Sequence, residues 1–252
     1  MLAEYVVRGA KAGLVAGLLF GLFVALVANP LIAVADGQGH ADAHHQEVGD
    51  HGDAHHESAV SATTTNAVSV GSSVLWALLL GTVVFGLLGY VLGPIVPGEG
   101  RVQGYLLALG GFVTVSGGPW LLLPPTVPGA ERSIASETGM VLYGGMVVAS
   151  ALACLLAAVS YDRLRDRCRR STATAAALVP LGALATVGAV SPFDSVTGSL
   201  SPDLAGAVLG TVVFGQALLW LALAATHARL EPTADEATQV ETPTTDPSLA
   251  AD

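Results

Sequence analysis

The chain has 252 residues, of which 52% are hydrophobic and only 12% are charged, and its formal net charge is −10. Soluble domains carry about 25% charged residues, so this composition excludes an ordinary soluble fold. With one lysine and nine arginines, the chain offers no basic face for nucleic acid. Its acidic, lysine-poor polar segments favour a halophilic source. Uncharged apolar runs long enough to cross a bilayer recur along the sequence, so we predict an all-α integral membrane protein.

The first predicted transmembrane helix occupies residues 1–34. Within it, glycine recurs at every fourth position: Gly9, Gly13, Gly17 and Gly21. At helical period these glycines form a stripe that another helix can approach closely. We expect the helix to begin to break at Asn29-Pro30. The alternative is a cleaved secretory signal ending near Ala33-Val34-Ala35, which would leave five spans; the length of the apolar stretch favours retention.

Residues 35–71 form a long polar connection. Six of the seven histidines lie between Asp36 and Ser58, together with six carboxylates. The pattern H-x-D-A-H-H occurs twice and contains the residues that we predict to bind metal: His40, Asp42, His44, His45, His51, Asp53, His55 and His56. Neutral imidazole suits Co²⁺, Ni²⁺, Cu²⁺ and Zn²⁺. A solvated acidic loop without metal is the alternative. The stretch from Ser58 to Ser69 is expected to be an unstructured spacer.

A helical membrane bundle is predicted over residues 72–226. Its five spans, which bring the total to six, are about 72–94, 103–125, 138–160, 172–190 and 204–226. The third span of the chain (103–125) is interrupted by Ser116-Gly117-Gly118-Pro119. Such backbone is tolerated at membrane depth only when it is buried in protein or lines a cavity. In transporters broken helices lie near the substrate path, whereas a plain proline kink is the alternative.

Gln216 is the only amide well inside a predicted span. It is either an interhelical hydrogen-bonding group or a substrate contact. The candidate pathway residues are therefore Ser116, Gly117, Gly118, Pro119 and Gln216. No Asp, Glu, Lys, Arg or His lies deep within any predicted span. No catalytic or nucleotide-binding motif is present, so we predict neither an enzyme nor a prosthetic group.

The distribution of basic residues predicts the orientation. With six spans and a cytoplasmic N-terminus, nine of the ten basic residues lie inside and only Arg132 lies outside, as the positive-inside rule requires. The histidine loop then faces outward from the cytoplasmic membrane. The acidic segment 227–252 becomes a disordered cytoplasmic tail.

A short internal repeat links two of the spans. The sequence LGTVVFG occupies Leu80–Gly86 and recurs at Leu209–Gly215. Both copies lie in spans that run from outside to inside. A duplication and a coincidence of biased composition are both compatible with this match.

Several features together resemble the CbtA family of predicted cobalt transporter subunits. They are the opening from Arg8 to Leu14 that leads to Asn29-Pro30-Leu31, the histidine-rich segment after the first span, the proline-rich exit from Leu123 to Gly129, and Gln216 followed by Leu219-Trp220. The resemblance implies cobalt uptake for cobalamin synthesis together with a small single-helix, histidine-bearing CbtB-like partner. One departure is Leu122-Leu123-Pro124, where the family pattern leads us to expect a Lys-Tyr-Pro-like sequence.

The combined interpretation is a membrane permease subunit for a divalent transition metal. Co²⁺ is favoured by the resemblance, while Ni²⁺ and Zn²⁺ fit the ligand types equally well. In this interpretation the outer histidine loop captures the ion before it enters the helical bundle. The alternative is a non-transporting membrane scaffold or sensor that binds metal outside.

Overall fold

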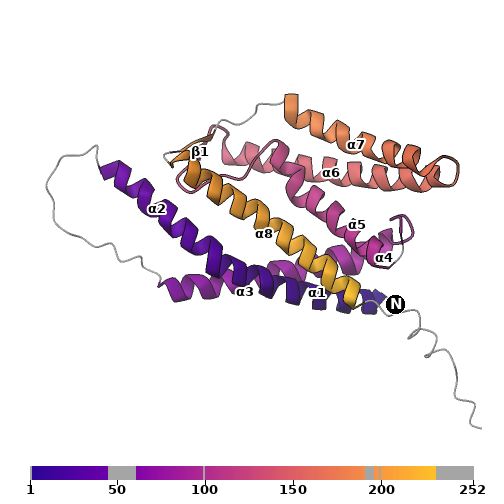
Figure 1. Cartoon of the computed structure of the whole chain (residues 1–252), viewed down its shortest axis with the longest axis horizontal. Coiled ribbons are helices and arrows are strands. Elements are labelled where there is room, and N and C mark those ends of the chain that lie inside the picture. Colours follow the sequence, from indigo (N-terminus) through magenta and orange to yellow (C-terminus); the bar gives the residue numbers. More distant parts are fainter. Residues whose placement is uncertain (1, 45–60, 99, 191–195, 199, 231–252) are drawn as a thin grey trace, which may run out of the picture.

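The computed structural model describes residues 2–44, 61–98, 100–190, 196–198 and 200–230. These residues form a helical bundle with one two-stranded antiparallel ribbon (Figure 1). The α-helices are α1 (Leu2–Phe23), α2 (Asn29–His44), α3 (Ala62–Leu80), α4 (Gly89–Leu92), α5 (Arg101–Phe112), α6 (Ser136–Arg165), α7 (Arg170–Val190) and α8 (Pro202–Arg229). Three π-helical segments, a 3₁₀ turn and two strands complete it: η1 (Val24–Ala28), η2 (Gly81–Leu88), η3 (Val113–Gly117), η4 (Pro119–Leu121), β1 (Glu131–Arg132) and β2 (Val196–Thr197).

Within the described ranges, five helices are long and apolar enough to cross a membrane. They are Leu2–Gly37, Thr63–Leu92, Ser136–Arg165, Arg170–Ala189 and Pro202–Arg229. The predicted all-helical, membrane-spanning architecture is thus confirmed. The predicted span 103–125 differs from the others, because α5 ends at Phe112 and gives way to η3 and η4.

The outer surface of the bundle is apolar. Large hydrophobic side chains on several helices are exposed, such as Leu26 (73%), Met140 (75%) and Val141 (75%). An apolar surface of this extent is not stable in water and marks a membrane environment. The buried interior is instead rich in small residues, as expected where van der Waals contact rather than the hydrophobic effect holds helices together.

The glycine stripe of α1 faces α3 and η2, as predicted. All four of its glycines are buried. A Cβ atom on Gly13 would lie 2.7 Å from Cα of Leu78, and one on Gly17 would lie 2.7 Å from Cα of Val74. Both distances are shorter than any tolerated contact, so only glycine permits this approach of the two backbones.

The expected break at Asn29-Pro30 is wrong, because the helix continues into α2 as far as His44. Proline removes one backbone donor and its ring crowds the preceding turn. Here the wider π-helical turn η1 comes directly before it, and Asn29 N–H reaches back to the carbonyl oxygen of Val24. The register shift of η1 accommodates the proline inside a continuous helix.

Helix α3 begins at Ala62, earlier than the predicted start at residue 72. The expectation of an unstructured spacer is therefore wrong for its described part. Ser61 caps the helix, since its Oγ accepts a hydrogen bond from Thr64 N–H at 3.3 Å, as N-terminal serines commonly do. Asn29 Nδ2 on α2 also donates to Asn66 Oδ1 (2.8 Å) and to Ser69 Oγ (3.2 Å) of α3. These bonds connect the first turns of α3 to the neighbouring helix.

Helix α8 lies at the centre of the bundle, between α1 and α5 (Figure 1). Its residues Leu219, Trp220, Leu223 and Ala224 belong to the larger buried cluster, together with Phe85 of η2. A smaller cluster joins α6 and α7 through Met146, Ala153 and Leu184. The two clusters are connected through η3 and η4, the continuation of α5, which contact α6.

The N-terminus of α1 and the C-terminus of α8 lie at the same end of the bundle, and the α6–α7 connection lies there too (Figure 1). Strands β1 and β2 lie at the opposite end, where Glu131 pairs with Thr197. The interrupted α5–η3–η4 segment runs between these two ends of the bundle, as the long helices do (Figure 1).

Candidate functional site

The predicted metal-binding loop is only partly described. His40, Asp42 and His44 lie in the last turns of α2, so the helix extends into the first copy of the histidine pattern. His45, His51, Asp53, His55 and His56 lie outside the described residues. Among the residues that are described, no group of three or more His, Cys, Asp or Glu could hold a metal ion.

The predicted pathway residues meet where α5 is interrupted. Gly118 N–H bonds to the carbonyl oxygen of Val113 at 2.7 Å, which is the wide spacing of a π-helix. Pro119, which lacks an N–H, then starts the 3₁₀ turn η4. Ser116 is only 4% exposed, and its Oγ donates to Oε1 of Gln216 on α8 at 3.1 Å. The structure thus brings together Ser116 and Gln216, which lie a hundred residues apart.

Helix α6 closes the other side of the interruption. The hydroxyl of Tyr143 donates to the carbonyl oxygen of Val115 at 2.8 Å, which satisfies one acceptor of the irregular turn. Gly118 touches Ser150, and a Cβ on this glycine would overlap the serine side chain. Ser150 is fully buried, and its Oγ has no hydrogen-bond partner among the described residues. The interruption is therefore buried in protein and lined by hydroxyl and amide groups.

Helices α5 and α8 run antiparallel in a fixed register. A Cβ on Gly111 would overlap the ring of Trp220, and one on Gly104 would lie 3.6 Å from Nδ1 of His227. Both rings occupy notches that glycine leaves in α5. The contacts Ser116–Gln216, Gly111–Trp220 and Gly104–His227 therefore form one continuous interface along the two helices.

His227 is the residue that the sequence analysis missed. The predicted sixth span ended at residue 226, whereas α8 continues to Arg229 and buries His227 to 6% exposure. Neither ring nitrogen has a hydrogen-bond partner among the described residues. Its ring lies 4.9 Å from that of Phe85 in η2. Its spacing from Gln216, eleven residues or about three helical turns, could have placed it on the same face.

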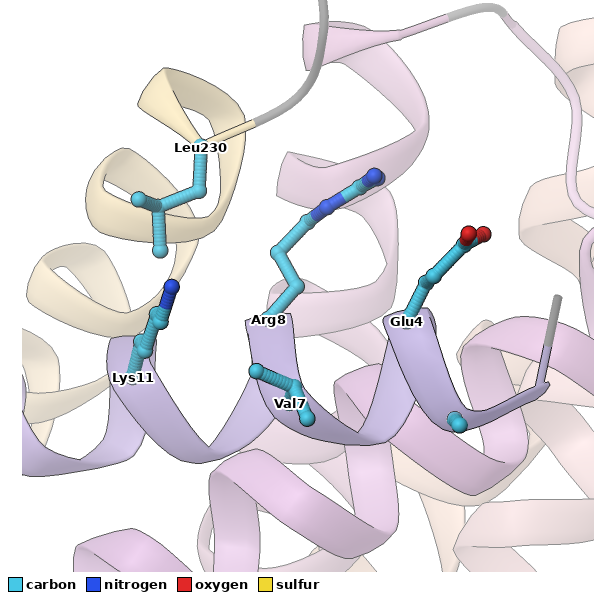
Figure 2. A pocket seen from close by; sticks show the side chains of 6 residues that line it. Glu4, Val7, Arg8, Lys11 and Leu230 are labelled. Atoms are coloured by element: carbon cyan, nitrogen blue, oxygen red, sulfur yellow. The ribbon is translucent and has the colours of Figure 1, made fainter.

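A small cavity opens at this end of the bundle, between the first turns of α1 and the residue that follows α8. It has a volume of about 350 Å³ and is lined by Ala3, Glu4, Val7, Arg8, Lys11 and Leu230. Figure 2 shows the side chain of Lys11 pointing from α1 toward Leu230 at the end of α8, and that of Arg8 rising from the same face of α1 but away from Leu230. The guanidinium of Arg8 also lies over the Tyr5 ring, 5.6 Å from its centroid. The cavity therefore combines an apolar lining with two basic side chains and one carboxylate.

Comparison with known proteins identifies a family that accounts for nearly the whole chain. The model of the CbtA family, described as "Probable cobalt transporter subunit (CbtA)", matches residues 2–231. The comparisons with curated proteins and with solved structures give no match. The matched range includes all the helices described above and ends just after the C-terminus of α8. We conclude that the chain belongs to the CbtA family of probable cobalt transporter subunits.

Proposed function

We propose that this chain is the membrane permease subunit for uptake of a divalent transition metal, with Co²⁺ as its cargo. The observation that carries this proposal is the interrupted α5, whose Ser116 bonds to Gln216 inside an apolar bundle. Irregular backbone lined by polar groups is what a membrane protein uses to lead an ion past lipid. Family membership supplies the choice of cobalt.

The bundle geometry supports six passes with both termini in the cytoplasm. The basic residues of α1, the α6–α7 connection and the end of α8 lie at one end, and Arg132 of β1 lies at the other (Figure 1). Under the positive-inside rule the basic end is cytoplasmic. The histidine-rich segment between α2 and α3 then faces outward. The close glycine contacts of α1 with α3 support retention of the first helix in the mature protein.

In the proposed mechanism the outer histidines raise the local concentration of metal. The pattern H-x-D-A-H-H, which occurs twice in this segment, supplies imidazole and carboxylate groups of the kind that bind divalent transition metals. The ion then exchanges part of its water shell for oxygen and nitrogen atoms along the α5–α8 interface. The family description calls the protein a subunit; we propose a small single-helix, histidine-bearing partner.

Reconstitution in proteoliposomes tests this function. The full chain is purified, alone and with its partner, and inserted into vesicles that contain a Co²⁺-sensitive dye. We expect saturable Co²⁺ entry that exceeds the leak of protein-free vesicles. A vesicle preparation that binds Co²⁺ at its outer surface but admits none would contradict the permease and favour the scaffold or sensor alternative.

A further inference from the structure

The buried imidazole of His227 has no partner that explains its burial. The side chain is 6% exposed, and both ring nitrogens lack hydrogen-bond partners among the described residues. Leaving buried polar atoms unpaired costs free energy, so native proteins rarely tolerate it without a functional reason. An apolar residue of similar size would fill the notch opposite Gly104 without that cost. The ring nitrogens therefore point to a ligand that binds them in another state of the protein.

The position of His227 relates it to the interrupted helix. Gln216 and His227 are eleven residues apart on α8, about three turns, and both face α5. Gln216 contacts Ser116 near the interruption, and His227 contacts Gly104 near the start of α5. An ion that follows this interface from the interruption toward the end of α8 meets the imidazole last. Beyond it lies the cavity lined by Arg8, Lys11 and Leu230 (Figure 2).

We infer that His227 binds the transported metal ion through a ring nitrogen, at the inner end of the path between α5 and α8. This inference rests on the proposed function. Imidazole nitrogen is a ligand for Co²⁺, Ni²⁺ and Zn²⁺. A single imidazole, with water in the remaining positions, gives the weak binding that a conducted ion needs in order to leave again.

The charges around the ring fit a release step. Arg8 lies near enough for its charge to act on His227, and Lys11 lines the same cavity. Positive charges near the His227 ring repel a bound cation and so increase its rate of dissociation. The ring of Phe85 is tilted against the imidazole, with the ring centroids 4.9 Å apart.

Two substitutions separate metal binding from packing. His227→Phe keeps a ring of similar size that can stack on Phe85 but has no ligand atom. His227→Cys leaves a gap in the interface but supplies a thiolate, which is a metal ligand. If His227 binds the ion, H227C retains more Co²⁺ uptake than H227F, and H227F falls roughly tenfold or more below the wild type. If H227F transports as well as or better than H227C, the ring is a packing residue and the inference is overturned.

A binding measurement tests the metal site at His227 independently of whether the protein transports Co²⁺. Trp220 lies two turns from His227 on α8, about 10 Å along the axis, so bound Co²⁺ quenches its fluorescence. The full chain carrying Trp76→Phe and Trp120→Phe reports Trp220 alone. We expect saturable quenching by Co²⁺ and none by Mg²⁺, with the saturable part lost in H227F. Quenching without transport would contradict the permease function but support the metal site at His227. Identical quenching in H227F would contradict the metal site.

Discussion

The register of α5 against α8 can be tested by adding a side chain at Gly111. A Cβ there would overlap the ring of Trp220, which is itself only 3% exposed. Gly110, the preceding residue of α5, has nothing within 4 Å of its Cβ position. The matched variants Gly111→Val and Gly110→Val therefore differ in the direction they face and in little else.

We expect G111V to lower the stability of the protein and G110V to leave it unchanged or raise it slightly. Valine forms helix slightly better than glycine, by a few tenths of a kcal/mol, and this gain applies to both variants. Overpacking at a buried contact costs about 1–3 kcal/mol, and the direct overlap with the buried indole places G111V at the upper end. A loss of about 2 kcal/mol corresponds to a fall in Tm of roughly 4–8 °C for a chain of this size. G110V should leave Tm unchanged or slightly raised.

Thermal unfolding of the purified protein in detergent, followed by tryptophan emission or by light scattering, measures the difference. A second-site change, Trp220→Leu, should reduce the cost of G111V, with a coupling energy of about 1 kcal/mol or more in a double-mutant cycle. Equal Tm values for G111V and G110V, or strict additivity with W220L, would refute the α5–α8 register. The placements of Gln216 and His227 would then also be lost.

Three further outcomes are expected. Gln216→Leu should lower stability by only about 0.6–1.5 kcal/mol, as for other hydrogen bonds within membranes, which is less than the loss expected for G111V. It should nevertheless reduce Co²⁺ uptake more than G111V does; losses of uptake that follow the losses of Tm in both variants would argue for a structural role alone. Gly17→Val should weaken the contact of α1 with α3 and reduce the yield of folded protein, whereas Gly71→Val, where the Cβ position is open, should not; equal yields would contradict the glycine stripe. Replacement of all six loop histidines should raise the external Co²⁺ concentration needed for half-maximal uptake and leave the maximal rate nearly unchanged, measured by initial rates of Co²⁺ entry; unchanged uptake at low Co²⁺ would remove the loop from the mechanism.

Much of the membrane architecture follows from local patterns along the chain. Apolar runs predicted helices close to α6, α7 and α8, and the four-residue glycine period predicted the buried face of α1. The sequence Ser116-Gly117-Gly118-Pro119 predicted the interruption after α5. These properties depend on hydrophobicity and backbone freedom, which a short segment specifies by itself. Helix ends were predicted less well, because Ser61 and Asn29 define them through contacts that hydropathy does not reveal.

The candidate site depended more on the tertiary structure. Gln216 could be selected as a lone amide in an apolar span and Ser116 as part of a broken helix, but the hydrogen bond between them could not be predicted. His227 was missed because it lies one residue beyond the predicted end of its span, where an exposed histidine is the ordinary expectation. Its burial results from the glycine notch at Gly104 and from Phe85 of η2. Neither of these residues is near His227 in the sequence.

The repeated segment LGTVVFG shows which properties its residues determine alone and which depend on tertiary contacts. Hydrophobic composition alone determines that both copies are helical and lie in the membrane. Yet Leu80–Gly86 enters the π-helix η2 and buries Phe85 completely, whereas Leu209–Gly215 is regular α-helix and leaves Phe214 57% exposed. Gly81 and Gly86 of the first copy touch the backbone of α1, while Gly210 of the second has nothing within 4 Å. Identical residues therefore differ in helix type and burial, because close backbone contact from a neighbouring helix acts on one copy and not on the other.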